Sequence, residues 1–272
     1  MNKTIKELNL EDDFLFAKVM TDKHICKKVL EKILNIKINK IEMPQDQKVV
    51  DLLLESKGIR LDIYVNDENG TIYNVEMQKG NNKNLAKRSR YYQGNIDLDL
   101  ISKGDDYRKL KKSFVIFICT FDPFDKGRHL YTFNNLCVQD TSLMLNDETN
   151  KVFLSTKGIL NDVDEELAEF LGYIENSTDE YVSHAKSNLV KEIHERVIEV
   201  KQDKRMEVEF MTLLERDREK FEEGVEKGIQ KGIEQGIEKG KREAAKALIG
   251  ILEDEVIAEK IGLKLEEVKK LH

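Results

Sequence analysis

The segment that most restricts the fold of this chain is the apolar run at residues 114–121, FVIFICTF. A continuous apolar run of this length is expected for a strand buried on both faces, at the centre of a sheet. Helical periodicity lies on both sides of it, at residues 5–36, 84–102, 163–174 and from 179 onward, with further strands at 129–139 and 151–155. The fold class is therefore predicted to be α/β or α+β, with a mostly covered sheet.

Two alternating segments predict a β-hairpin before this run. Apolar and polar residues alternate over residues 59–65 and again over residues 71–77, which is the period of a strand. The sequence Asp-Glu-Asn-Gly at 67–70 separates them and is a turn signal. We therefore expect two neighbouring antiparallel strands.

The length of the hairpin loop decides whether acidic residues of the two strands meet. A three-residue loop that ends in a left-handed Gly70 pairs Asp62 with Glu76. Paired residues share a face of the sheet, and Gln78 lies on that face as well. Loops of two or four residues would put the two acids on opposite faces, but the glycine at the third loop position favours the three-residue loop.

Two carboxylates on adjacent strands predict a site for a divalent cation. Mg²⁺ and Mn²⁺ prefer oxygen ligands, and such an ion lowers the pKa of a bound water and neutralises charge on a scissile phosphate. Asp62 and Glu76 are the candidate ligands, and the backbone carbonyl of Met77 is a third. The alternative is that both acids are ordinary polar residues of an exposed hairpin.

A basic segment follows the hairpin. Residues 83–112 contain nine Lys or Arg and four Asp residues, although the whole chain has a net charge of −7. Basic side chains with interleaved tyrosines are suited to contact a phosphate backbone, whereas packing in the core is the alternative for Tyr91 and Tyr92, one of which we expect to point inward. The candidate DNA-contacting residues on the predicted helix are Lys87, Arg88, Arg90, Tyr91 and Gln93.

Missing motifs exclude several classes of protein. The chain has no GxGxxG, GxxxxGK[ST] or GxSxG motif, and its five histidines lack the spacing of a zinc site. The sequence therefore lacks the usual motifs of dehydrogenases, P-loop ATPases and α/β-hydrolases. The N-terminus is too polar for a signal peptide and no apolar run approaches ~18 residues, so we predict a cytoplasmic protein without a membrane segment.

The C-terminal part of the chain follows a different pattern. From residue 223 it reads EGVEKGIQKGIEQGIEKGK, with a glycine at every fourth position. Each glycine costs a helix roughly 1 kcal/mol, so a solvated helical linker is one interpretation. Close approach of small residues, giving a homodimer through this tail, is the other. Residues 244–272 regain amphipathic order around a Gly262 turn, as in half of a helix-turn-helix or in a small docking or dimerising bundle.

These motifs together resemble one known family. The segments DFLF, LDIYV, IYNVEMQ, KRSRYYQ and KGDDYRKLK occur in this order within roughly residues 8–160. In order and spacing they are similar to the recombination-promoting nuclease/putative transposase family, a branch of the PD-(D/E)XK nuclease superfamily. The tail of Gly/Glu/Lys repeats ending in IAEKIGLKLEEVKKL is also typical of that family.

The resemblance implies a restriction-endonuclease-like core, with a central mixed sheet flanked by helices, and Mg²⁺-dependent cleavage of DNA. By position, Asp62 and Glu76 take the places of the two motif acids. Gln78 replaces the usual lysine; it carries no charge but can orient the attacking water. Asp13 falls where the N-terminal helix often supplies a further acid. Lys79 is next in sequence, but alternation directs it to the opposite face.

We therefore predict a nuclease-like domain at residues 1–205, a helical linker at 206–243 and a small helical segment at 244–272. The predicted function is metal-dependent DNA endonuclease activity linked to recombination or mobile elements, with Asp62, Glu76 and Gln78 as catalytic residues. The rival is a non-catalytic or weakly catalytic DNA- or protein-binding module, with a decayed nuclease core and a self-association tail.

Overall fold

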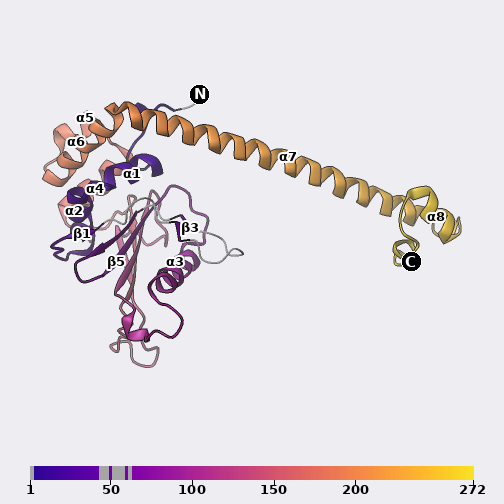
Figure 1. Ribbon diagram of the computed structural model, residues 1–272, viewed down its shortest axis with the longest axis horizontal. Coiled ribbons are helices and arrows are strands. Elements are labelled where there is room, and N and C mark those ends of the chain that lie inside the picture. Colours follow the sequence, from indigo (N-terminus) through magenta and orange to yellow (C-terminus); the bar gives the residue numbers. More distant parts are fainter. Residues whose placement is uncertain (1–2, 43–48, 51–58, 61–62) are drawn as a thin grey trace. The chain divides into compact units, whose positions relative to one another are not determined.

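The computed structural model describes residues 3–42 and 63–272, together with the backbone of two short strands, β2 (Val49–Val50) and β3 (Ile59–Arg60). The chain divides into two compact units, Met1–Val208 and Glu209–His272 (Figure 1). β2 and β3 form an antiparallel pair of their own. All other strands belong to one sheet in the first unit.

The main sheet is mixed and has six strands in the order β1-β4-β5-β6-β8-β7. β5, β6 and β8 run parallel, whereas β1, β4 and β7 are antiparallel to their neighbours. The strands are β1 (Ile41–Glu42), β4 (Ile63–Asp67), β5 (Ile72–Gln78), β6 (Ser113–Cys119), β7 (Leu130–Phe133) and β8 (Thr149–Ser155). The predicted fold class, a sheet flanked by helices, is confirmed.

β6 is the central strand that the apolar run predicts. All seven of its residues are buried, and it lies between two parallel neighbours, β5 and β8. Its Phe117 stacks on Phe153 of β8, with ring centroids 5.4 Å apart, and on Tyr92 at 5.8 Å. Both faces of the strand are therefore inside the protein, because helices cover the sheet on each side.

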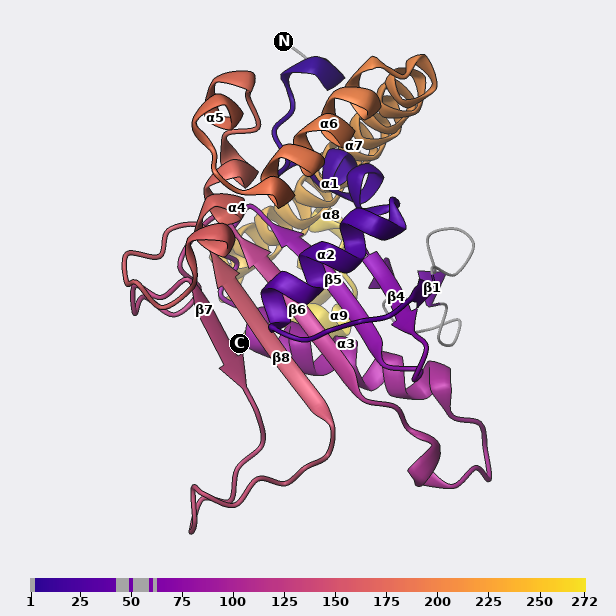
Figure 2. The same cartoon turned by 90° about the vertical axis from the view of Figure 1, so that its left-hand side faces the viewer.

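Helices form a layer on each face of the sheet (Figure 2). One face is covered by α3 (Leu85–Leu100), whose Tyr92 and Ile96 belong to the same buried cluster as Val115 and Phe117. The remaining helical elements of the first unit are η1 (Ile5–Glu7), α1 (Asp13–Met20), α2 (Lys23–Leu34), η2 (Tyr107–Lys109), α4 (Glu165–Glu175), α5 (Asp179–His184) and α6 (Asn188–Gln202).

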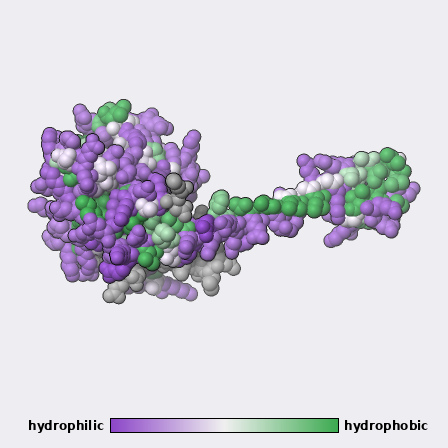
Figure 3. Space-filling model, turned by 90° about the horizontal axis from the view of Figure 1, so that it is seen from above, coloured by the Kyte–Doolittle hydropathy of each residue, from purple (hydrophilic) through white to green (hydrophobic). Residues whose placement is uncertain are grey.

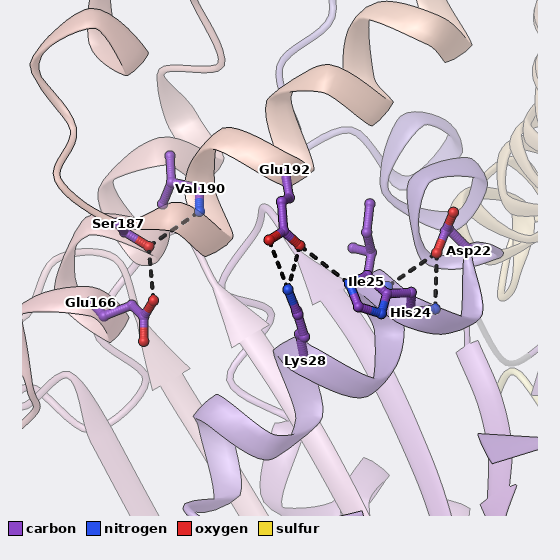
Figure 4. A network of polar contacts seen from close by, with 8 residues as sticks. All are labelled: Asp22, His24, Ile25, Lys28, Glu166, Ser187, Val190 and Glu192. Atoms are coloured by element: carbon purple, nitrogen blue, oxygen red, sulfur yellow. Dashed lines mark hydrogen bonds and ion pairs between the residues drawn. The ribbon is translucent and has the colours of Figure 1, made fainter. Parts of the chain in front are cut away.

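The layer on the other face is held together partly by polar contacts between α2, α4 and α6 (Figure 4). Lys28 Nζ of α2 lies 2.6 Å from Glu192 Oε2 of α6, and His24 Nε2 lies 3.4 Å from the same oxygen. Ser187 accepts a hydrogen bond from the amide of Val190, which caps α6, and donates to Glu166 of α4. Each side chain in this network has a structural partner.

The β4–β5 hairpin has the predicted register. Ile63 pairs with Val75, and the amide of Asp67 donates to the Thr71 carbonyl at 3.1 Å. The loop between them has three residues and ends in Gly70, whose φ of +78° is left-handed. The prediction of the three-residue loop is therefore confirmed. The predicted strand at 59–65 includes β3 and the start of β4, while residues 61–62 lie outside the described part of the chain.

The second unit contains most of one long helix and two short ones. α7 (Lys204–Leu248) is 45 residues long and includes the whole glycine repeat. α8 (Asp254–Ile261) and α9 (Leu265–Lys269) enclose a small core of Ala245, Ile257 and Val268. Gly262 ends α8 with a φ of +71°, which confirms the predicted glycine turn. No helix among the described residues combines the length and the apolar character needed to cross a membrane.

Candidate active site

Glu76 and Gln78 lie at the C-terminal end of β5, on the face that α3 covers. Because side chains alternate along a strand, Asn74 shares this face with them. The Glu76 side chain is only 3% exposed. A buried carboxylate is costly unless it is paired and hydrogen-bonded, so its surroundings show what stabilises it.

Arg88 of α3 reaches into this group of polar residues. Its Nη1 donates to Gln78 Oε1 at 2.5 Å, and its Nη2 donates to the hydroxyl of Tyr92 at 2.7 Å. Nη2 also lies 3.8 Å from Glu76 Oε2. The guanidinium carbon stands over the rings of Tyr92 and Phe117, at 5.4 and 5.6 Å from their centroids. The arginine is therefore fixed on the buried side of α3.

The Asn74 amide is a further neighbour of Glu76. In the orientation that satisfies both of its amide atoms, its nitrogen donates to Glu76 Oε1 at 3.2 Å and to the Ile63 carbonyl at 3.1 Å. Asn74 is completely buried and pairs across the hairpin with Tyr64. Its amide thus connects the carboxylate to the backbone of β4. Sequence reasoning did not single out Asn74, although its place two residues before Glu76 put it on the same face.

Gln78 has both ends of its amide occupied. Oε1 accepts from Arg88, and Nε2 donates to the Met77 carbonyl at 2.6 Å. The Met77 carbonyl, a candidate cation ligand, is therefore next to the Gln78 amide. Lys79 is directed elsewhere, as alternation predicted, because its Nζ lies 3.0 Å from Asp12 Oδ2.

The same ion pair brings α1 to this end of the sheet. Asp12 caps α1 by accepting a hydrogen bond from the Phe14 amide at 3.1 Å. Since Lys79 directly follows β5, the pair places Asp13, the exposed first residue of α1, near the end of the strand that carries Glu76 and Gln78. Asp62 lies outside the described residues. Within the described part of the chain, no three His, Cys, Asp or Glu side chains form a group that could hold a metal ion.

The metal-ligand atoms available among the described residues are of the type that a hard divalent cation binds. They are the buried carboxylate of Glu76, the Met77 carbonyl and the amide oxygen of Gln78. All three are oxygens, which Mg²⁺ and Mn²⁺ prefer over nitrogen and sulfur. A second carboxylate has to come from beyond this set.

The candidate DNA-contacting residues of α3 divide into two groups. Lys87, Arg90 and Tyr91 are exposed, with Tyr91 at 41%. Tyr92 is the inward tyrosine that the sequence predicted. Gln93 is also buried, and its Nε2 donates to Ser113 Oγ at 2.8 Å, so its observed contact anchors α3 to β6. A signal for this division was present in the sequence, because Leu85, Arg88, Tyr92 and Ile96 recur at helical spacing.

The rest of the basic segment lies at the other end of the sheet. Ser113, which follows it, pairs with Ile72, the first residue of β5. At about 3.3 Å per residue, the two ends of such a strand are roughly 20 Å apart. In addition, Arg108 and Lys109 form ion pairs with Asp106 and Asp105. The net positive charge of residues 83–112 is therefore not gathered in one place.

A six-stranded mixed sheet flanked by helices, with a carboxylate buried at the end of an inner strand, defines a protein of the restriction-endonuclease-like class. The chain matches the family model of the PD-(D/E)XK nuclease family transposases over residues 11–232 of its 272, and it belongs to that family. The family resemblance inferred from the motifs is thus confirmed. Neither the curated proteins nor the solved structures contain a significant match to the chain.

Proposed function

We propose that the protein is a metal-dependent endonuclease that hydrolyses phosphodiester bonds in DNA. The observation that carries the proposal is the buried Glu76, placed beside Gln78 and Arg88 at the end of β5 in a member of this nuclease family. Family membership also supports a role linked to recombination or mobile elements.

Asp62 is proposed as the second acid. The described pairs of the hairpin, such as Ile63 with Val75, have residue numbers that add up to 138. Continued by one pair, that register would set Asp62 opposite Glu76. The Asp62 and Glu76 carboxylates and the Met77 carbonyl would hold Mg²⁺ or Mn²⁺, with Asp13 as an additional acid.

A divalent cation at this position would supply a water of lowered pKa and positive charge for the phosphate. The chain's own residues would orient the attacking water and hold the DNA backbone. Gln78 Oε1 has a second lone pair beside the one that Arg88 uses, and it can accept a hydrogen from the attacking water and orient it. Lys87, Arg90 and Tyr91 stand on the exposed side of α3, where they would contact the DNA backbone.

The proposal is tested by plasmid nicking with Mg²⁺ or Mn²⁺. We expect the wild-type protein to convert supercoiled plasmid to open circles, and Asp62→Ala and Glu76→Ala to lose at least about 100-fold in rate, as when a group that stabilises the transition state is removed. Asp99→Ala, at an exposed acid near the other end of α3, is the matched control and should keep full activity. Equal inertness of the wild type and Asp62→Ala would favour the non-catalytic binding module instead.

We also propose that the repeat in α7 joins two copies of the chain. Val225, Ile229, Ile233 and Ile237 follow its glycines and are between 43% and 59% exposed. Among the described residues, a Cβ added to any glycine from Gly224 to Gly240 would meet no atom within 4 Å, which leaves space beside the stripe for a second helix. Small residues at every fourth position suit a close helix crossing.

A further inference from the structure

We infer that Arg88 supplies the catalytic positive charge that this site lacks at position 78. The inference rests on the proposed nuclease function and names a residue for one of its roles. Gln78 is uncharged, yet the guanidinium of Arg88 binds its amide oxygen at 2.5 Å. A cation therefore stands beside position 78 although it comes from α3 and not from β5.

The position of Arg88 is firmly held. The Tyr92 hydroxyl accepts from Nη2 at 2.7 Å, one helical turn further along α3, and two aromatic rings lie beneath the guanidinium. Arginine has five N–H donors in a planar fork. Within the described part of the chain, the bonds to Gln78 and Tyr92 use two of them, which leaves donors for a phosphate oxygen.

The electrostatic setting gives this charge its effect. The Arg88 side chain is 29% exposed and lies 3.8 Å from a carboxylate that is 3% exposed. A charge that is mostly out of water is less screened than one on the surface. A fixed donor of this kind stabilises negative charge that develops on the phosphate in the transition state without having to reorganise.

Nearby cations in the sequence do not take this role. Lys79 is bound to Asp12 on the other side of β5. Lys87 and Arg90 are exposed, whereas Arg88 is on the side of α3 that faces the sheet. A purely structural alternative is that Arg88 only neutralises the buried Glu76, and the experiment has to separate the two roles.

The test moves the charge from α3 back to β5. We expect Arg88→Gln to lower single-turnover cleavage of a DNA duplex by about 100-fold or more, with little change in the DNA concentration that gives half-maximal rate. Adding Gln78→Lys to this variant should recover at least tenfold, and Arg88→Lys should keep part of the rate. Lys87→Gln, the exposed neighbour, should instead act mainly on binding: the half-maximal DNA concentration should rise, and the rate at saturating DNA should fall far less than in Arg88→Gln.

A double variant no faster than Arg88→Gln, with both melting at the wild-type temperature, would overturn the inference. A rate loss in Arg88→Gln that vanishes when the assay is run well below a lowered melting temperature would also overturn it, because that loss is structural.

Mn²⁺ binding to the protein alone, measured by calorimetry, gives a second readout that does not depend on cleavage. Removing a positive charge 3.8 Å from a cation ligand should tighten Mn²⁺ binding several-fold in Arg88→Gln but not in Lys87→Gln. Equal affinities in the wild type and Arg88→Gln would place Arg88 away from the cation and overturn the inference. If the wild type cleaves no DNA but the affinities differ, the proposed function fails while the position of the charge beside the cation is upheld.

Discussion

The central strand β6 and the glycine repeat of α7 use apolar residues in opposite ways. All seven residues of β6 are buried, whereas the Val and Ile residues of the repeat are about half exposed and form a row along α7 (Figure 3). The strand is held by tertiary packing. The helix is held by its own backbone and by ion pairs one turn apart, such as Lys227 with Glu223 and Arg242 with Glu238. Apolar content alone therefore does not show where a chain has its core.

The strongest test of this contrast is to remove one large side chain from each region. Phe117→Ala should lower the free energy of unfolding by about 3–5 kcal/mol, because it opens a cavity between stacked rings. Ile233→Ala, measured at a protein concentration low enough to keep the chain monomeric, should change it by less than about 0.5 kcal/mol, as an exposed substitution does. Urea denaturation followed by circular dichroism measures both. Similar costs for the two variants would mean that the repeat is packed as tightly as the sheet.

A second test asks whether the exposed row is an interface between copies. Glutamate at both Ile229 and Ile233 places like charges in the proposed contact, and should weaken self-association by at least about tenfold, or 1.4 kcal/mol. Sedimentation equilibrium measures the dissociation constant. Gln230→Glu, which leaves the row intact, is the control. A wild-type chain that stays monomeric at high micromolar concentration would rule out the dimer and leave α7 as a solvated linker.

A third test concerns the glycines of the repeat. Gly228→Ala should stabilise α7 by about 1 kcal/mol, since alanine is the better helix former and its Cβ would meet no atom of the described residues within 4 Å. The helical signal of α7 should then persist to higher temperature. If the glycines make the contact between copies, the same change should weaken self-association, and unchanged association would exclude them from it.

The smallest expected effect is the pH dependence at Asp164, which caps α4. The Leu167 amide holds the pKa of this carboxyl below its usual value, and Lys32 adds to the effect. A depressed pKa contributes stability that is present above the unfolded-state pKa and is lost as pH falls through the folded-state pKa. Asp164→Asn should therefore flatten the loss of stability in acid by no more than about 1 kcal/mol, because the side chain is 62% exposed and solvent screens its pair with Lys32.

That measurement consists of urea midpoints between pH 7 and pH 3, compared for the wild type and the variant. Asp140→Asn, in an exposed loop outside the helices, has a carboxyl whose pKa is lowered by Ser142 alone and serves as the control. A steeper acid loss in Asp164→Asn than in the wild type would contradict the expected sign.

The hairpin and the central strand could be predicted because their causes are local. Gly70 determines the loop length and hence the register of the hairpin. An unbroken apolar run is stable as a strand only where both of its faces are covered, which is the middle of a sheet. The pairing of Asp62 with Glu76 follows from the same register and stays a prediction. The positions of the basic residues in the fold could not be predicted from local sequence in the same way. Lys111 and Arg88 are close in sequence, but the connection between α3 and β6 takes them to opposite ends of the sheet.

The role proposed for Arg88 could not be predicted from residue type alone. Lys87, Arg88 and Arg90 look alike as phosphate contacts, and only the packing of α3 against Phe117 shows which of them faces inward. The sequence does contain a signal for the inward side, because Leu85, Arg88, Tyr92 and Ile96 recur at helical spacing. Burial, more than charge, separates the proposed site residue Arg88 from the surface residues Lys87 and Arg90.

Folding stability constrains the two sides of α3 differently. Arg88, Tyr92 and Gln93 are tied to the sheet, so a substitution there disturbs several partners at once. Lys87, Arg90 and Tyr91 stand in solvent, where substitutions typically cost less than about 0.5 kcal/mol. Folding stability therefore constrains the inner side of this one helix and leaves its outer side, turn by turn, to be set by what the helix binds.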